Sequence, residues 1–404
     1  MNIEILIEQI LRKMSRTGKV QARFFITLAK QWVRQRGRYC FDNLVRRGFM
    51  NAMSYRLNFD KGFNFKEFNK ILIELYASSE RIICFDPSFI SKSGKHTYGL
   101  GYFWSGCAQS VKKGLEIGSL AIGDAVNNTA FHYYAAQTVL KEGQSLMEYY
   151  TSLLVSQATK LLLLSNYVVV DAYFAKYGFV NELNNNKLDV ITRLRDDAAL
   201  WYLYRGKVTK KRGRPTKYDG KVNLKDLDMR HFSCFEVCKS HKAFEAVVFS
   251  KSLKRSLKVI VVHNLKDEDT IKSVKIFACT DTSLEGFKVW KYYKLRFNRT
   301  GGPEEFLFRD GKQFLGLNHC QSRQKDRLCF HFNFCLTMIS IAKVVHWLSI
   351  PIQLRPAFSI QDIKTQYVNE HLLDKFISGL GICSETTKKS DNYRNLINYT
   401  KIAA

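Results

Sequence analysis

The sequence predicts an α/β fold in which a mixed sheet carries single acidic residues at the ends of its strands. Residues 81–90 (RIICFDPSFI) and 167–176 (YVVVDAYFAK) are apolar, strand-like runs that lead into one aspartate each, Asp86 and Asp171. The segments around them follow the order β-β-β-α-β-α-β, which is typical of a mixed sheet. A charge at the end of a buried strand is costly unless something compensates for it, so the two aspartates indicate a divalent-metal site.

Before these strands, residues 1–80 are predicted to be a helical domain that binds DNA. In the segment 21–37 apolar residues recur at helical spacing, with Arg and Lys side chains outside that stripe. The segment 38–59 continues in the same style. A basic helical domain is suited to DNA binding, and a basic face that is only solvated is the alternative.

Residues 81–195 are predicted to be the first part of a catalytic core. After the Asp86 strand, glycines punctuate short apolar runs, which is typical of two further strands. Residues 131–160 have a helical pattern, and the Asp171 strand follows them. A short helix and a last strand over residues 187–195 complete this part.

Residues 196–290 are predicted to be a β-rich insertion, because their apolar runs are short, β-branched and separated by charged turns. Within them, residues 206–221 are basic and broken by Gly and Pro, which indicates a loop. Helical character returns over residues 291–349, the predicted second part of the core. Residues 350–404 form a tail whose helical patches suit either the pairing of protomers or the capping of the core.

The charge balance indicates a polyanionic partner. The chain has 404 residues, and 63 Lys plus Arg against 36 Asp plus Glu leave a formal charge of +27. So large an excess destabilises a compact state by self-repulsion. Nucleic acid is the first candidate partner, since binding would be driven by counterion release. The composition is globular, which excludes a disordered chain, and it lacks the polybasic tail expected for attachment to a membrane surface.

The sequence also predicts a cytoplasmic, nucleoid-associated protein. Its start, MNIEILIEQI, is amphipathic with acids, unlike a signal peptide. The ten cysteines show no regular spacing, as expected for reduced thiols. No unbroken membrane-spanning run is expected, because the best stretch, residues 336–354, contains Lys343 and His346.

A third acid is predicted after the insertion. Pro303 is well placed as the first residue of a helix, and Glu305 in its first turn suits the positive end of the helix dipole. Glu305, Arg309 and Lys312 fall at i, i+4 and i+7, on one helical face. That face would present a metal-binding carboxylate with two phosphate-binding cations. A first-turn acid and a Glu–Arg pair are also common surface chemistry.

With these residues, the chain resembles the DDE transposases of bacterial insertion sequences, in the group with the Y-x2-R-x3-E-x6-K signature. Tyr293-x2-Arg296 fits the first half of the signature, and Glu305-x6-Lys312 fits the second. The strand-end aspartates match the first two catalytic acids of the family. The stretches FDPSFI, KSGK, TYGLGYFWSG and GKQFLGLNHCQSR also look like those of such transposases, over roughly residues 20–350.

One departure concerns the spacing. The family has three residues between its arginine and its glutamate, whereas FNRTGGPE separates Arg296 from Glu305 here. A Gly-Gly-Pro break cannot keep Tyr293, Arg296 and Glu305 on one continuous helix. Either a loop returns Tyr293 and Arg296 to the site, or the signature is altered. Glu304 is a substitute for Glu305 that loses the spacing to Lys312.

The resemblance implies an RNase H-like fold and a mechanism. Asp86, Asp171 and Glu305 would hold two Mg²⁺ ions, with Mn²⁺ as a substitute, through hard oxygen ligands. The site would hydrolyse the phosphodiester at each element end and then join that 3′ end to target DNA. Tyr293, Arg296 and Lys312 would contact the terminal phosphates. The implied partners are double-stranded DNA, as terminal inverted repeats and as target, and a second protomer in a synaptic homodimer.

The loop KKRGRPTK is a further predicted DNA contact. Lys210, Lys211, Arg212 and Arg214 suit the phosphates of DNA. The core Arg-Gly-Arg-Pro also looks like an AT-hook, which would place two arginines in a narrow minor groove. A merely solvated loop is the third alternative.

Two clusters of His and Cys are weighed as zinc sites. The spacing H-x2-C-x3-C-x2-H lacks the long loop of most zinc folds, so buried, small apolar cysteines are expected instead. The four residues of the second cluster lie on a predicted helix but not on one face of it, so they are not expected to bind one zinc ion. The two sets are His231, Cys234, Cys238 and His241, and His319, Cys320, Cys329 and His331.

Two other functions stay open. The altered spacing before Glu305 favours a catalytically impaired or non-enzymatic DNA-binding protein, such as a repressor. A structure-specific RNase H-like nuclease would share the acids but not the Tyr, Arg and Lys of the signature.

Overall fold

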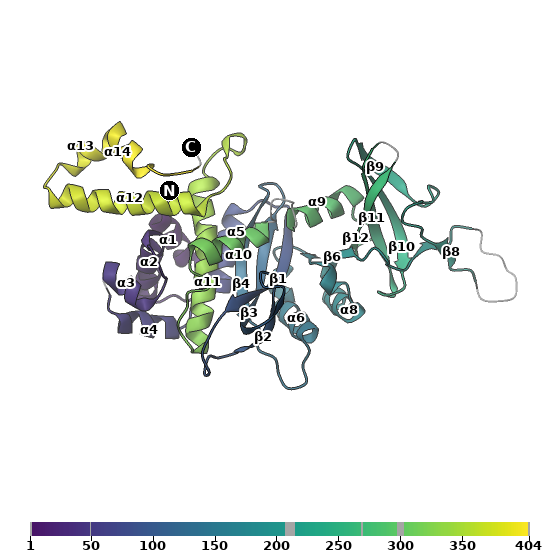
Figure 1. The fold of residues 1–404 in the computed structure, drawn as a ribbon, viewed down its shortest axis with the longest axis horizontal. Coiled ribbons are helices and arrows are strands. Elements are labelled where there is room, and N and C mark those ends of the chain that lie inside the picture. The colour runs from purple at the N-terminus through teal and green to yellow at the C-terminus, as the bar shows by residue number, and fades with distance from the viewer. Residues whose placement is uncertain (1, 49, 207–214, 268–269, 297–302, 403–404) are drawn as a thin grey trace.

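One large mixed sheet runs through the molecule, and helices pack against it (Figure 1). The computed structural model describes residues 2–48, 50–206, 215–267, 270–296 and 303–402, except for the side chains of residues 47 and 303–306. The α/β class predicted from the sequence, a mixed sheet with helices, is confirmed.

The strands that carry the two aspartates lie in the middle of the sheet. Along it the order is β2-β3-β1-β5-β6-β12-β11-β10-β7-β8, with β4 paired to β3 and β9 to β10. β1 is antiparallel to β3 and parallel to β5, which is parallel to β6. The strands are β1 (Arg81–Ser91), β2 (Gly101–Ser105), β3 (Ser110–Asp124), β4 (Thr129–Gln137), β5 (Tyr167–Val169), β6 (Asp189–Leu194), β7 (Leu200–Leu203), β8 (Tyr218–Lys221), β9 (Ser233–Cys238), β10 (His241–Ser250), β11 (Arg255–Leu265) and β12 (Ile271–Cys279).

Helices at the start of the chain share a core with the rest of the molecule. Trp32 donates a hydrogen bond to the Leu315 carbonyl (3.1 Å), and the rings of Phe25 and Phe334 lie 5.1 Å apart. The apolar stripe expected on the second helix is buried. These helices are α1 (Ile3–Lys13), α2 (Lys19–Arg34), α3 (Phe41–Arg47), α4 (Ala52–Asp60) and α5 (Phe65–Tyr76).

The helix predicted over residues 131–160 is wrong in its first half. Thr129–Gln137 is strand β4, which pairs with β3, and its aromatic residues fit that buried edge. The helix starts only after Ser145, whose side chain forms a capping box with Glu148. The helices that follow are α6 (Leu146–Val155), α7 (Ala158–Leu161), η1 (Ala172–Phe174) and α8 (Tyr177–Asn185).

Strands β7–β12 extend the same sheet. β12 pairs with β6 in the register Ile276↔Leu194, so the described part of residues 196–290 joins the central strands directly. In Figure 1 this region occupies one end of the molecule, and the first and last helices occupy the other. The division into domains stays a prediction, because the sheet crosses the expected boundary at residue 196.

The last third of the chain is helical. α11 is long and apolar enough, together with the π-helix that follows it, to cross a membrane by length and composition, which the sequence analysis did not expect. In this structure 94% of its apolar window is buried, and the helix packs against β4 and α5. The elements are α9 (Gly286–Arg296), α10 (Pro303–Phe314), α11 (Lys325–Ala342), η2 (Lys343–Trp347), η3 (Ile352–Leu354), α12 (Ile360–Gly379), α13 (Ser384–Lys389) and α14 (Asp391–Ile397).

Candidate active site

Asp86 and Asp171 lie at the same level on neighbouring parallel strands. β1 and β5 pair in the register Ile83↔Val168 and Cys84↔Val169. Two residues after the second pair, the two segments reach Asp86 and Asp171. Asp171 still has extended backbone angles (φ −77°, ψ 177°). Neighbouring strands are roughly 5 Å apart, and residues at one level point to the same face. The register of β1 and β5 therefore leads to the two aspartates at the same level along the two strands.

Arg296 holds the first of these carboxylates. Its Nη2 lies 2.9 Å from Asp86 Oδ1 and donates to the Phe85 carbonyl at 2.9 Å. The arginine side chain is 2% exposed, and that of Asp86 is 28% exposed. Arg296 is the last residue of α9, so the end of that helix fixes the rotamer of a carboxylate on β1. The resemblance assigned Arg296 to DNA phosphates, but in this structure it contacts Asp86.

Asp171 is held by its own backbone neighbourhood. It caps η1, and its Oδ1 accepts a hydrogen bond from the Tyr173 amide at 2.9 Å. Its carbonyl accepts from Thr192 Oγ1 at 2.8 Å, which ties β5 to β6 just beyond their paired residues. Lys176 Nζ lies 4.5 Å from the centroid of the Tyr173 ring and adds a cation nearby. The second aspartate is thus anchored just after β5 by hydrogen bonds of its side chain and its carbonyl.

Lys312 comes to the same strand from α10. Its Nζ donates to Ser88 Oγ at 2.8 Å, two residues beyond Asp86. Burial lowers the pKa of Lys312, while Cys107 and Asp86 act in the opposite direction. α10 begins at Pro303, as the sequence predicts. The prediction that Asp86 ends its strand is wrong, because β1 continues to Ser91 and Asp86 lies within it. The face of α10 that contains residue 312 meets β1 at Ser88, two residues after Asp86.

Glu305 lies on that face by helical spacing, seven residues before Lys312. Its side chain is outside the described residues, so its place beside the aspartates stays a prediction. Arg309, between them, lies 3.2 Å from Asp310 and is 48% exposed. Because α9 ends at Arg296 and α10 begins at Pro303, the signature spans two helices. Within the described residues, the signature is therefore carried by two elements, α9 and α10.

Tyr293, the first signature residue, is buried. It is 8% exposed, and its ring centroid lies 4.6 Å from that of Phe277. It is one turn before Arg296 on α9 and so helps to seat the end of that helix on β12. This packing orients Arg296 toward Asp86.

A buried acid that the sequence analysis missed lies behind Asp86. Glu116 on β3 is 6% exposed and accepts a hydrogen bond from the Tyr150 hydroxyl at 2.6 Å. Burial raises the pKa of Glu116, and burial together with Glu116 and Asp86 raises that of Tyr150. The signal was present in the sequence, since a single Glu interrupts the apolar run LEIGSLAIG. An acid at that position needs a partner, and Tyr150 provides it.

The donor chemistry at the strand ends fits Mg²⁺. Two carboxylates in register offer the hard oxygen ligands that this ion prefers. Within the described residues no group of three or more His, Cys, Asp or Glu side chains is arranged to hold a metal ion. The third ligand would have to come from the undescribed Glu305 side chain.

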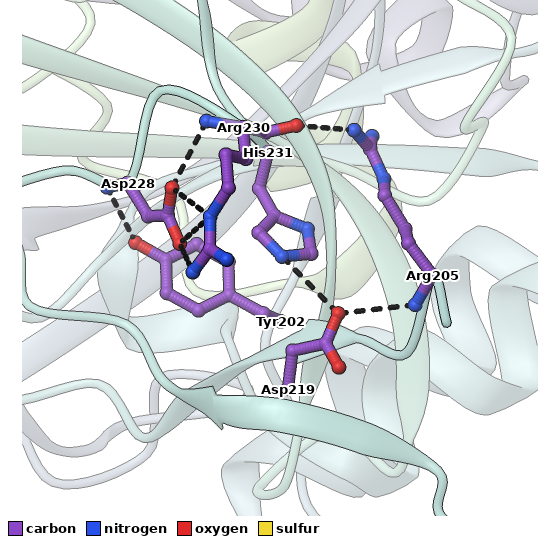
Figure 2. A network of polar contacts seen from close by, with 6 residues as sticks. All are labelled: Tyr202, Arg205, Asp219, Asp228, Arg230 and His231. Carbon is purple, nitrogen blue, oxygen red and sulfur yellow. Dashed lines mark hydrogen bonds and ion pairs between the residues drawn. The ribbon is translucent and has the colours of Figure 1, made fainter. Parts of the chain in front are cut away.

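The side chains of His231, Cys234, Cys238 and His241 do not meet at one point that could hold zinc. His231 lies 3.3 Å from Asp219 and stacks on Tyr202, within the polar network that Figure 2 shows. Cys238 instead contacts His241, at 2.9 Å between Sγ and Nδ1. The expectation of buried cysteines is wrong, because Cys234 is exposed and Cys238 half-buried. The strand β9 lies at an edge, where alternate side chains face water.

The second cluster is also not a metal site among the described residues. His331 Nε2 donates to the Gly316 carbonyl (2.8 Å), and burial lowers the pKa of His331 to about 4. His319 and Cys320 precede α11 instead of lying on a helix. The predicted DNA contacts of the basic loop, Lys210, Lys211, Arg212 and Arg214, lie outside the described residues.

Comparison with known proteins adds little to this geometry. No family model matches the chain, and no curated protein matches it. A cryo-EM structure of a piggyBac transposase synaptic complex with hairpin DNA aligns with a TM-score of 0.40 at 13% sequence identity, over 98% of this chain and 81% of that chain. A likeness of that size carries no argument, so the function has to be argued from the residues at the strand ends.

Proposed function

We propose that this chain is a DDE transposase that cuts DNA at the ends of an insertion sequence and joins the 3′ ends to target DNA by metal-dependent phosphoryl transfer. The observation that carries the proposal is the register of Asp86 and Asp171 on β1 and β5. Two cations from separate helices, Arg296 and Lys312, contact neighbouring residues of β1, Asp86 and Ser88. Charged side chains that are gathered and partly buried cost free energy, and such clusters are typical of functional sites.

The topology supports an RNase H-like core. β3 pairs antiparallel with both β4 and β1. On the other side of β1, β5 pairs in parallel with β1, and β6 pairs in parallel with β5. This order places the first acid on the central strand and the second on its parallel neighbour. The acid on α10 would then complete the set from the last helix of the core.

Asp86, Asp171 and Glu305 are the residues that would hold Mg²⁺. When bound, two such ions supply activation of the attacking oxygen and stabilisation of the leaving oxygen in an in-line displacement. Arg296 keeps the Asp86 carboxylate in one orientation. Lys312, which is partly desolvated beside Ser88, and Arg309, half exposed on the same helix, would bind the phosphate oxygens of the DNA.

The partners follow from the charge and from the reaction. A formal charge of +27 favours a DNA duplex, with the terminal inverted repeats and the target as the two substrates. Joining two element ends in one complex needs at least two protomers, so the proposed active form is a homodimer. The proposed location is the bacterial cytoplasm, at the nucleoid.

The test is cleavage and strand joining on a duplex that carries the inverted repeats bracketing this reading frame, with Mg²⁺. Nicking at the repeat ends followed by joining of the 3′ end to a target plasmid is expected. Loss of both steps in Asp86→Ala, Asp171→Ala and Glu305→Ala supports the proposal. Binding without cleavage contradicts it and favours the repressor-like alternative, which the split signature would explain. Cleavage without joining favours a nuclease.

A further inference from the structure

A cavity of about 400 Å³ lies between α2 and α12, and neither Asp86 nor Asp171 is among its lining residues. Figure 1 shows α12 crossing beside the first helices, at the end of the molecule opposite the β-rich strands. Gln31, Gln35 and Val368 form buried parts of its wall. A concave site of this size accommodates a small ligand or one group of a larger one.

The wall of this cavity is strongly cationic. Its charged residues include no aspartate or glutamate within the described part of the chain. One of the cations, Lys30, is neutralised by Glu4 at 2.8 Å. The residues that can carry a positive charge are Lys30, Arg34, Arg36, His371 and Lys375.

Arg34 has an unused donor inside this wall. Its Nε is buried and has no hydrogen-bond partner among the described residues, and the same holds for Oε1 of the adjacent Gln35. A buried N–H without an acceptor costs free energy that an incoming acceptor would recover. Arg36 and Lys375 also line the cavity and are exposed, so they can contact a ligand that enters from solvent. An acceptor with negative charge would satisfy both the donor and the excess charge.

A neighbouring cavity on the same helix shows that this excess is local. It measures about 590 Å³, lies between α1 and α2, and includes Glu4 and Glu8 beside its cations. Glu8 is 3.6 Å from Arg12. Acidic residues therefore line the cavity on one side of α2, and none of the described lining residues on the other side is acidic. A general excess of basic residues in the chain does not produce that difference.

We propose that the cavity between α2 and α12 binds a phosphate group through Arg34 and Lys375, and that this phosphate belongs to the backbone of DNA bound outside the cleaved bond. Guanidinium N–H groups match phosphate oxygens in geometry and charge. The site joins the first helices to the tail of the chain, and so gives α12 a part in binding DNA. Only the choice of DNA as the source of the phosphate rests on the proposed function.

The first experiment uses inorganic pyrophosphate as the probe, with affinity measured by titration calorimetry. Relative to the unmodified protein, Arg34→Gln/Lys375→Gln is expected to bind pyrophosphate ~10-fold or more weakly. Arg23→Gln is the matched control, because Arg23 lies on the same helix but lines the compensated cavity. Lys375→Glu, at an exposed position, gives a second variant that should fold normally. Equal affinity of all variants for pyrophosphate overturns the site.

The second experiment separates DNA from a free phosphate compound. Affinity for a 20-base-pair duplex is measured by fluorescence anisotropy at several salt concentrations. Loss of two phosphate contacts should reduce the slope of log K against log[salt] by about 2 in the double variant and leave it unchanged in Arg23→Gln. Weaker pyrophosphate binding with unchanged DNA binding overturns the assignment to DNA.

Cleavage is scored on the same preparations. Arg34 and Lys375 lie on α2 and α12, whereas Asp86 lies on β1, so saturating DNA should be cut by the double variant at the normal rate. If no preparation cuts DNA, the transposase proposal fails, while the pyrophosphate titration still decides the cavity. The two proposals can therefore fail separately.

Discussion

The charges at the strand ends and those of the β-rich region are assembled in opposite ways. Asp86 receives Arg296 from a helix more than 200 residues later, and that arginine is 2% exposed. In the network of Figure 2, Arg230 pairs with Asp228 two residues away and is 84% exposed. Exposed local pairs form readily and contribute little. A long-range buried pair exists only because the whole fold holds it, which makes the strand ends the better candidate for function.

The largest expected difference between the two regions is in catalysis. Asp86→Asn or Asp171→Asn should lower the rate of Mg²⁺-dependent DNA cleavage by ~10³-fold, because each removes a metal-binding charge. Asp228→Asn should leave the rate within the error of the assay. The measurement is single-turnover cleavage of the inverted-repeat duplex, with DNA binding measured in parallel. A comparable loss of rate in all three variants would remove the distinction between the regions.

The strands that lead to the two aspartates could be predicted because their signal is local, although β1 continues past Asp86 to Ser91. An apolar run that leads into one acid is visible in a short window, and the parallel pairing of β1 with β5 then sets both acids at one level. The start of α10 at Pro303 is likewise written in the local sequence. Such features depend on few distant contacts.

Features that depend on distant contacts were missed. The segment FHYYAAQ became β4 because pairing with β3 decided between two patterns that its residues allow. The contact of Arg296 with Asp86 instead of DNA, and the partnership of Glu116 with Tyr150, also depend on which elements meet. The spacing of residues along the sequence does not show which elements meet in the fold.

The second prediction measures how strongly the buried pair is coupled. In a double-mutant cycle of Asp86→Asn and Arg296→Gln, the free energy of unfolding should show a coupling of about 2 kcal/mol, because either single change leaves a desolvated partner. The same cycle with Asp228→Asn and Arg230→Gln should show no measurable coupling. Urea unfolding at pH 7 supplies both values. Absence of coupling between Asp86 and Arg296 would mean that the contact does not hold the carboxylate.

A third prediction concerns the acid behind the site. Burial raises the pKa of Glu116 above its value in the unfolded chain. The stability that this group contributes is therefore present below the unfolded pKa and is lost as the pH rises through the folded pKa. Glu116→Gln, which can still accept from Tyr150, should raise the melting temperature by roughly 2 °C at pH 8 and lose that advantage below pH 4.5. An advantage that is equal at both pH values would assign it to packing instead of charge.

The smallest effect is expected in the network of Figure 2. Hydrogen bonds from Arg230 lower the pKa of Asp228 to about 2. The contribution of this group is thus present above the unfolded pKa of the carboxyl and is lost as the pH falls through about 2. Because the Arg230 side chain is largely exposed to water, salt should screen it. The melting temperature of Asp228→Asn should differ only slightly from that of the unmodified protein in low salt and not at all in 0.5 M NaCl, whereas the effect of Arg296→Gln should persist in salt. A salt-resistant loss in Asp228→Asn would place a buried, long-range charge contact in the β-rich region as well.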